Sequence, residues 1–192
     1  MPATAALDRS DTDDELDEVL ARAEAYFGHV PNLVRVMSRN PAMCRTVTNF
    51  LIQALGPGRL PWGFKELLIL KTLRAIGSHY SYGAHERIAA DLGVPDEKIG
   101  DVANALWQTS EYFSDRERAV FALVEQIAED ANAVPDALWD ELRDHWDHGQ
   151  LLEANAVITT YVMIGRVGDA LGVAEPVLFE RPVSEVAAHT AA

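Results

Sequence analysis

A glutamate, two serines and a histidine in the middle of the chain are the residues best suited to chemistry. Glu66 lies twelve residues before Ser78, Ser81 follows three residues later, and His85 comes four residues after that. At helical spacing Ser78, Ser81 and His85 share one face. Histidine gains and loses a proton near neutral pH, a carboxylate can orient it or hold a second proton, and hydroxyls can bind a developing oxyanion or a carboxylate. The set therefore predicts proton transfer.

Glu66 and His85 also have a purely structural interpretation. Glu66 lies in an apolar helical pattern at 61–76, and the residues three and four positions further on are Ile69 and Leu70. Because no basic neighbour on the helix pairs with it, a buried carboxylate is one interpretation, and a glutamate that reaches water from the edge of the apolar face is the other. His85 is either an acid–base group or a hydrogen-bonded histidine of the core.

Two helices must position these side chains. We expect them at 61–76 and 79–92, with Gly77 in the short turn between them. A short turn lays the second helix antiparallel against the first. Glu66 and His85 are then expected on facing surfaces of a helix hairpin.

The whole chain predicts an all-α fold. Apolar residues recur at helical spacing, strand-like alternation is almost absent, and the breaks fall at proline and glycine clusters. Ser114 and Glu117 have the spacing of a capping box. Prolines suited to a first helical turn are Pro61, Pro95 and Pro135, and glycines suited to a helix end are Gly56, Gly77, Gly93 and Gly172. The other expected helices are 13–27, 32–38, 41–54, 95–108, 115–130, 135–147 and 149–171.

Length and charge limit the class of protein. The 192 residues suit one domain, expected at 13–178 between a disordered N-terminus (1–12) and a loosely packed tail (179–192). The net charge of −14 argues against nucleic acid and anionic membranes as partners. No apolar run is long enough to span a membrane, and the start of the chain lacks the basic and apolar regions of a signal peptide. A soluble, cytoplasmic protein is expected.

The motif segment resembles a known family. ELLILKTLRAIGSHYSYGAHERIAADLGVPDEKI is similar to the core of the carboxymuconolactone decarboxylase family, which includes the alkylhydroperoxidase D-like proteins. In that family a glutamate precedes Cys-x-x-Cys by twelve residues and a histidine follows it by four, so Glu66, Ser78, Ser81 and His85 fall on the motif. The likeness extends over roughly residues 14–178. It implies an alkylhydroperoxidase D-like helical fold and a homo-oligomer, a trimer or hexamer.

The chain departs from the thiol peroxidases of this superfamily at both cysteine positions. A thiolate attacks peroxide and the second cysteine resolves the intermediate as a disulfide, which Ser78 and Ser81 cannot do. The motif is closer to the decarboxylase-like branch, which has S-x-Y-x-W-x-x-H here. Tyr82 stands where that branch often has tryptophan, and Ser81 where it often has glutamate. The missing glutamate puts the decarboxylase reaction itself in question.

Three functions remain open. The first is a non-redox enzyme, a lyase or isomerase that performs decarboxylation, lactone isomerisation, enolisation or elimination on a small organic acid or carbonyl compound. His85 and Glu66 would be catalytic, and the substrate-binding candidates are Ser78, Ser81, Tyr80 and Tyr82. The second is a ligand-binding or structural member without catalysis, and hydroperoxide reduction ranks last.

The other reactive side chains are expected to be structural. Cys44, the one cysteine of the chain, suits a small buried group and cannot form an intrachain disulfide. His145 and His148 are three residues apart, close enough to share a metal, but they lie in an acidic helical segment and are expected in solvent. No metal and no cofactor are therefore expected. Aromatic residues that suit an oligomer surface are Trp62, Phe64, Trp107 and Tyr112.

Overall fold

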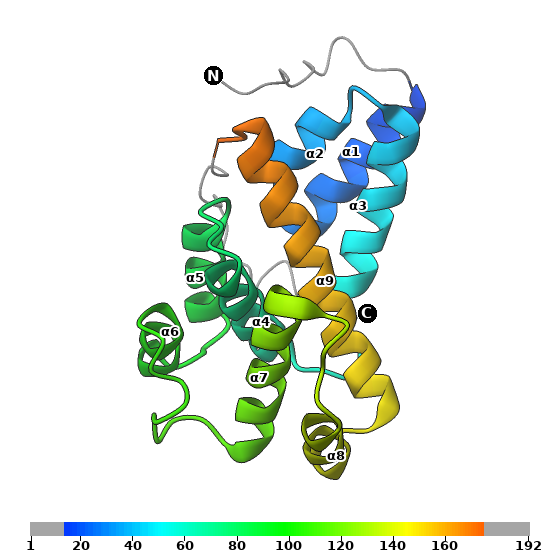
Figure 1. Cartoon of the computed structure of the whole chain (residues 1–192). Coiled ribbons are helices and arrows are strands. Elements are labelled where there is room, and N and C mark those ends of the chain that lie inside the picture. The colour runs from blue at the N-terminus through cyan, green and yellow to red at the C-terminus, as the bar shows by residue number, and fades with distance from the viewer. Residues whose placement is uncertain (1–13, 175–192) are drawn as a thin grey trace.

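The computed structural model of the protein describes residues 14–174, and within them the chain forms nine helices and no strand (Figure 1). This confirms the all-α class. The termini expected to be disordered or loosely packed, 1–12 and 179–192, lie outside the described residues. The helices are α1 (Asp14–Phe27), α2 (Asn32–Met37), α3 (Pro41–Leu55), α4 (Trp62–Ala75), α5 (Tyr82–Asp91), α6 (Asp96–Ala103), α7 (Asp115–Asp130), α8 (Asp136–His145) and α9 (His148–Leu171).

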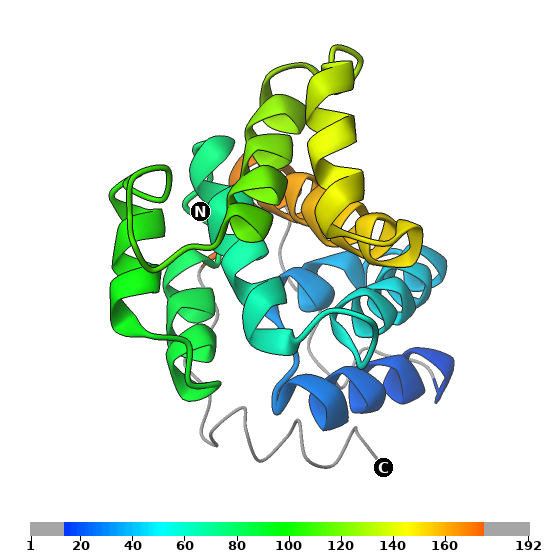
Figure 2. The ribbon, with the colours of Figure 1, turned by 90° about the horizontal axis from the view of Figure 1, so that it is seen from below.

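Helix α4 is the central element of the fold. It packs against α5, α6, α7 and α9, and every side chain from Lys65 to Leu73 is buried. Figure 2 shows the other helices around it. Helices α1, α2 and α3 lie beside α9 and form a second small core around Cys44. Because α4 is covered on all sides, its polar side chains must find partners inside the protein.

Lys65 is the more deeply buried of the two buried lysines of α4, at 1 % exposed. Its ammonium group donates to the carbonyl oxygens of Ala54, at 3.0 Å, and Gly56, at 2.7 Å. The same group forms an ion pair of 2.6 Å with Glu153 of α9. Three contacts satisfy the three ammonium protons. Lys65 thereby connects α4 to the C-terminal end of α3 and to α9.

Most helix ends follow the expected signals. The capping box of Ser114 and Glu117 is present at the start of α7. The three prolines each lie one position before the first helical residue, at the N-cap, rather than inside the first turn. Gly77 closes α4 with a left-handed φ of 66°. Gly56 differs, because it ends α3 in an extended conformation with φ −65° and ψ −179°.

Two expected helices are shorter than the sequence suggested. The helix expected at 79–92 begins only at Tyr82, because Ser81 adopts a left-handed conformation with φ 62° that interrupts helical hydrogen bonding. The helix expected at 95–108 ends at Ala103, where Ala105 has φ 58°. None of the helices in residues 14–174 is long and apolar enough to cross a membrane.

Candidate active site

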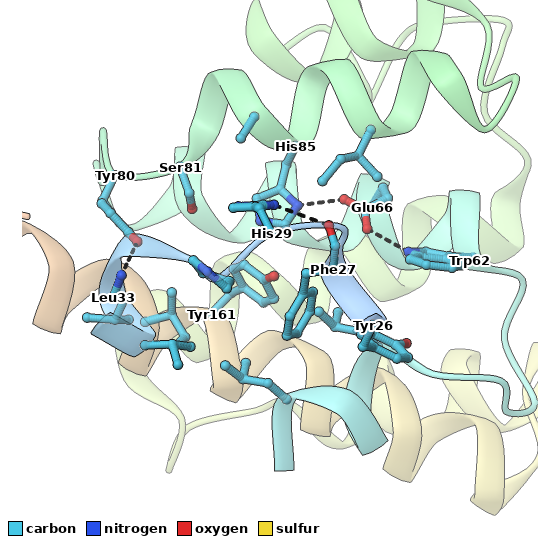
Figure 3. Close-up of a pocket in the computed structure, with 17 residues that line it drawn as sticks. Tyr26, Phe27, His29, Leu33, Trp62, Glu66, Tyr80, Ser81, His85 and Tyr161 are labelled. Carbon is cyan, nitrogen blue, oxygen red and sulfur yellow. Dashed lines mark hydrogen bonds and ion pairs between the residues drawn. The ribbon is translucent and has the colours of Figure 1, made fainter. Parts of the chain in front are cut away.

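Glu66 lies in the second turn of α4 with both carboxylate oxygens engaged. Its side chain is almost fully buried, since the residue is 1 % exposed. Oε2 lies 2.6 Å from Nδ1 of His85, and Oε1 accepts a 2.8 Å hydrogen bond from the indole Nε1 of Trp62 (Figure 3). Burial excludes the solvent-exposed interpretation of Glu66. Trp62 was not expected as its partner, although four residues of separation on a helix bring side chains together.

His85 lies in the first turn of α5 and is 8 % exposed. The turn at Gly77 returns the chain so that α5 packs on α4, which brings the imidazole to the Glu66 carboxylate as the spacing predicted. On its other side the ring meets the Tyr161 ring edge-on, with 4.8 Å between centroids and 89° between planes. The two contacts fix the orientation of the imidazole. Whether His85 acts as a catalyst stays a prediction.

The contact with Glu66 also selects the tautomer of His85. A carboxylate that accepts from both Trp62 and His85 requires a proton on Nδ1, which leaves the Nε2 lone pair as the base. We expect ¹⁵N NMR of the neutral imidazole to show a protonated Nδ1 and an unprotonated Nε2. Replacing Glu66 by leucine removes the acceptor and should shift the population toward protonated Nε2. Protonated Nε2 as the main form of the wild-type protein would contradict this assignment.

A cavity of about 80 Å³ opens beside His85 and Glu66. Its walls come from α1, α2, α3, α4, α5 and α9 and from the segments that link α1 to α2 and α4 to α5. The aromatic side chains of the wall are Tyr26, Phe27, Trp62, Tyr80 and Tyr161, and its other polar side chains are His29, Glu66, Ser81 and His85. Aliphatic residues and one proline complete the lining. The site is thus a small, mostly apolar chamber with the His85–Glu66 pair in its wall.

Two phenols of the cavity remain protonated near neutral pH. Burial, together with the nearby charge of Glu66, raises the pKa of Tyr26 to about 12. The same two causes raise the pKa of Tyr161 well above its usual value. The Tyr26 hydroxyl is buried and has no hydrogen-bond partner. It lies near Gly56 at the end of α3, where an added Cβ would be 3.4 Å from it.

Tyr80 links α2 to the motif, and His29 of the α1–α2 segment shares the cavity wall with it. Burial lowers the pKa of His29. The Tyr80 hydroxyl accepts a 3.2 Å hydrogen bond from the backbone nitrogen of Leu33, at the start of α2. The Tyr80 ring rests on Gly168 of α9, where an added Cβ would lie 2.4 Å from the ring. The sequence did not predict Tyr26, His29 or Tyr161 as residues of the wall. The one available signal was the segment YFGHVPN, because a histidine close to glycine and proline is common in functional loops.

The structure separates the two serines. Ser81 lines the cavity, is buried and has no hydrogen-bond partner for its hydroxyl. Ser78 instead packs against Gly165 of α9 and, with Tyr82, lines a different depression. The expected common helical face is therefore wrong, because the chain before Tyr82 is not helical. Ser81 and Tyr80 accompany His85 in the cavity, whereas Ser78 and Tyr82 do not.

The remaining candidates lie outside the cavity wall. Cys44 is fully buried, and its thiol lies 3.6 Å from the carbonyl oxygen of Val34, in keeping with a structural role. His145 and His148 are exposed. Within residues 14–174 no cluster of three histidine, cysteine or acidic side chains is arranged for a metal. Trp107 is buried, so it does not supply the aromatic surface expected for an oligomer, while Tyr112 is exposed.

Solved structures establish the fold class. The apo debrominase Bmp8 is 22 % identical, with a TM-score of 0.75 over 94 % of this chain and 96 % of that chain. A peroxidase-related protein with an alkylhydroperoxidase AhpD core from Ralstonia eutropha JMP134 is 18 % identical, with a TM-score of 0.78 over 97 % and 94 % of the two chains. A peroxidase-related protein from Silicibacter sp. TM1040 is 15 % identical, with a TM-score of 0.80 over 95 % of each chain. The chain therefore has the alkylhydroperoxidase D-like fold.

Sequence comparison supports the family resemblance. Residues 41–126, a little under half of the chain, match the model of the carboxymuconolactone decarboxylase family. The uncharacterized protein YdfG of Bacillus subtilis (strain 168) is 24 % identical over 109 residues, which cover 56 % of this chain and 73 % of that protein. The matched segment holds Trp62, Glu66, Ser81 and His85. The cavity residues Tyr26, His29 and Tyr161 lie outside it.

Proposed function

We propose that this chain is a member of the carboxymuconolactone decarboxylase family that performs proton transfer instead of thiol redox chemistry. The observation that carries the proposal is the buried 2.6 Å contact between Nδ1 of His85 and the Glu66 carboxylate in the wall of a cavity. Serines 78 and 81 stand where the family resemblance expects the reactive cysteines. A histidine oriented by a carboxylate is a general base that needs no thiol.

In this proposal His85 removes a proton through Nε2 and returns it to another atom of the substrate. Glu66 stabilises the imidazolium that forms, and it does so strongly because both groups are shielded from water. The Trp62 indole holds the carboxylate in place. The hydroxyl of Ser81 is buried in the cavity wall without a partner and can donate to an oxyanion on the substrate. These side chains suit the enolisation or isomerisation of a small carbonyl compound or lactone. Decarboxylation and elimination are variants of the same chemistry.

Deuterium uptake from heavy water tests the proposal with simple carbonyl compounds in place of the natural substrate. Small cyclic ketones and lactones, such as cyclopentanone and γ-butyrolactone, carry exchangeable protons beside a carbonyl group. We expect the wild-type protein to accelerate deuterium incorporation into at least one of them, at the same rate with and without a dithiol. A Cys44→Ala protein should keep that rate. Acceleration that needs a dithiol, or that disappears with Cys44, would contradict a non-redox mechanism.

Hydroperoxide reduction is expected to be absent. Neither Ser78 nor Ser81 can form the disulfide on which a thiol peroxidase depends, and Cys44 is fully buried away from them. With cumene hydroperoxide and a dithiol, the wild-type rate should equal that of the Ser78→Ala, Ser81→Ala protein. The measurement is peroxide consumption over time. Robust turnover that the double substitution removes would overturn the proposal.

A ligand-binding protein without catalysis is the second candidate. The apolar cavity favours it, since a cavity alone is sufficient for binding. A debrominase Bmp8 variant with a cysteine replaced by alanine was solved with 2,3,4-tribromopyrrole, so a protein of this fold can hold a small ring. Saturable binding of a carbonyl compound with no deuterium uptake would favour this second candidate.

A further inference from the structure

Among the residues that the structure describes, the wall of the cavity has no fixed positive charge. No lysine or arginine is among the residues that line it within 14–174. The buried lysines of α4 are engaged elsewhere, Lys65 by Glu153 and Lys71 by Glu125. Arg35, whose charge acts on His29, is exposed to solvent. An anionic ligand would find no permanent cation in the wall.

The titratable groups of the cavity do not replace that cation. The carboxylate of Glu66 is buried beside His85, so a proton on the imidazole only neutralises the pair. Burial keeps His29 neutral, because its pKa is lowered. Tyr26 and Tyr161 contribute no positive charge in either form. The described wall therefore carries a net charge of zero or below, and a carboxylate that leaves water for it loses its hydration without a cation to offset the loss.

The size and polarity of the cavity suit a compact neutral molecule. Its volume of about 80 Å³ is smaller than the ~150 Å³ apolar cavity that accommodates benzene. Ser81, which lines the cavity beside His85 (Figure 3), has a hydroxyl without a partner. This hydroxyl can donate a hydrogen bond, so an acceptor oxygen on the ligand is the matching group.

We propose that this cavity selects uncharged, compact carbonyl compounds, such as lactones, ketones and amides, and rejects carboxylates of the same shape. The inference rests on the proposed function, because it concerns the same cavity, and it narrows the substrate class from organic acids or carbonyl compounds to neutral carbonyl compounds. Aromatic side chains around the His85–Glu66 pair supply the apolar contact. Because the wall formed by residues 14–174 has no lysine or arginine, it discriminates against carboxylates.

Two ligands of nearly identical shape test the selection. Cyclopropanecarboxamide and cyclopropanecarboxylate have about six non-hydrogen atoms each and differ mainly in charge at about pH 7.5. The indole N–H resonance of Trp62 reports binding, because this group donates to Glu66, and a Trp62→Phe protein assigns it. We expect the amide to shift this resonance saturably and to bind about tenfold or more tightly than the carboxylate.

Removing the charge of Glu66 should largely abolish the discrimination between the amide and the carboxylate. In Glu66→Gln the wall becomes more positive by one unit, so we expect the carboxylate to gain about tenfold in affinity while the amide changes by less than about threefold. Glu86→Gln is the matched control, since Glu86 neighbours His85 on α5 but does not line the cavity, and it should alter neither affinity. Circular dichroism verifies that each variant is folded.

The proposal is overturned by a wild-type protein that binds the carboxylate as tightly as the amide. It is also overturned if neither ligand shifts the Trp62 resonance at about 50 mM, or if Glu66→Gln leaves the preference unchanged. Binding is measured here without turnover. A protein that prefers the amide but transfers no proton would contradict only the proposed function, whereas one that transfers protons but prefers the carboxylate would contradict only this inference.

Discussion

A His85→Ala protein is expected to lose about 10²- to 10⁴-fold in the rate of proton transfer, the usual contribution of a positioned acid–base group. Nδ1 of the imidazole contacts the Glu66 carboxylate, and in the proposed mechanism Nε2 is the atom that removes the proton. Alanine removes the base but retains the cavity. The measurement is deuterium incorporation into the best carbonyl compound, with binding followed separately, so that kcat falls while ligand affinity changes little.

His79→Ala is the matched control for this experiment. His79 lies in the loop just before α5, is exposed and is not part of the cavity wall, so its removal should leave the rate unchanged. Far-UV circular dichroism and the melting temperature must match the wild type in both proteins. A well-folded His85→Ala protein that works at the wild-type rate would assign His85 to the core and move the chemistry elsewhere.

Replacement of Lys65 by methionine is expected to lower the free energy of unfolding by about 3–5 kcal/mol. The side chain is 1 % exposed, and its ammonium group is the partner of Glu153 and of the carbonyl oxygens of Ala54 and Gly56. Methionine fills a similar volume but leaves a mostly buried carboxylate and two carbonyl groups without that donor. Urea unfolding followed by circular dichroism gives the change directly.

Two further variants identify the cause of this loss. Lys65→Met combined with Glu153→Leu removes both charges, and it should cost less than the sum of the two single substitutions because no charge is left unpaired. Arg143→Met breaks an exposed ion pair with Asp140 and should cost less than about 1 kcal/mol. Additive losses at Lys65 and Glu153 would show that the ion pair is not what stabilises this part of the fold.

The helices could be predicted because their signals are local. Apolar residues at helical spacing and the proline and glycine breaks gave the helix order, and Ser114 with Glu117 gave a start that the structure confirms. The contact of Glu66 with His85 followed from helical spacing and from the short turn at Gly77. The left-handed Ser81 could not be predicted, because a serine carries no local signal for that conformation.

The rest of the site depends on long-range packing. Tyr26 and His29 come from one end of the chain and Tyr161 from the other, and only the arrangement of α1, α4 and α9 brings them to His85. A periodic pattern predicts local structure and does not predict contacts between residues so far apart in the sequence. Lys65 was missed for a related reason: a helix covered on all sides buries lysines that an amphipathic pattern would place in water.

A double-mutant cycle on His85 and Glu66 tests most directly whether the buried pair performs the proton transfer as one unit. Rates of deuterium incorporation are measured for the wild type, His85→Ala, Glu66→Gln and the combined protein. If Glu66 acts by orienting and stabilising the imidazole, the combined protein should be no slower than His85→Ala alone, because the carboxylate has nothing left to assist. Losses that multiply, with the combined protein slower by the product of the two single effects, would contradict a single catalytic unit.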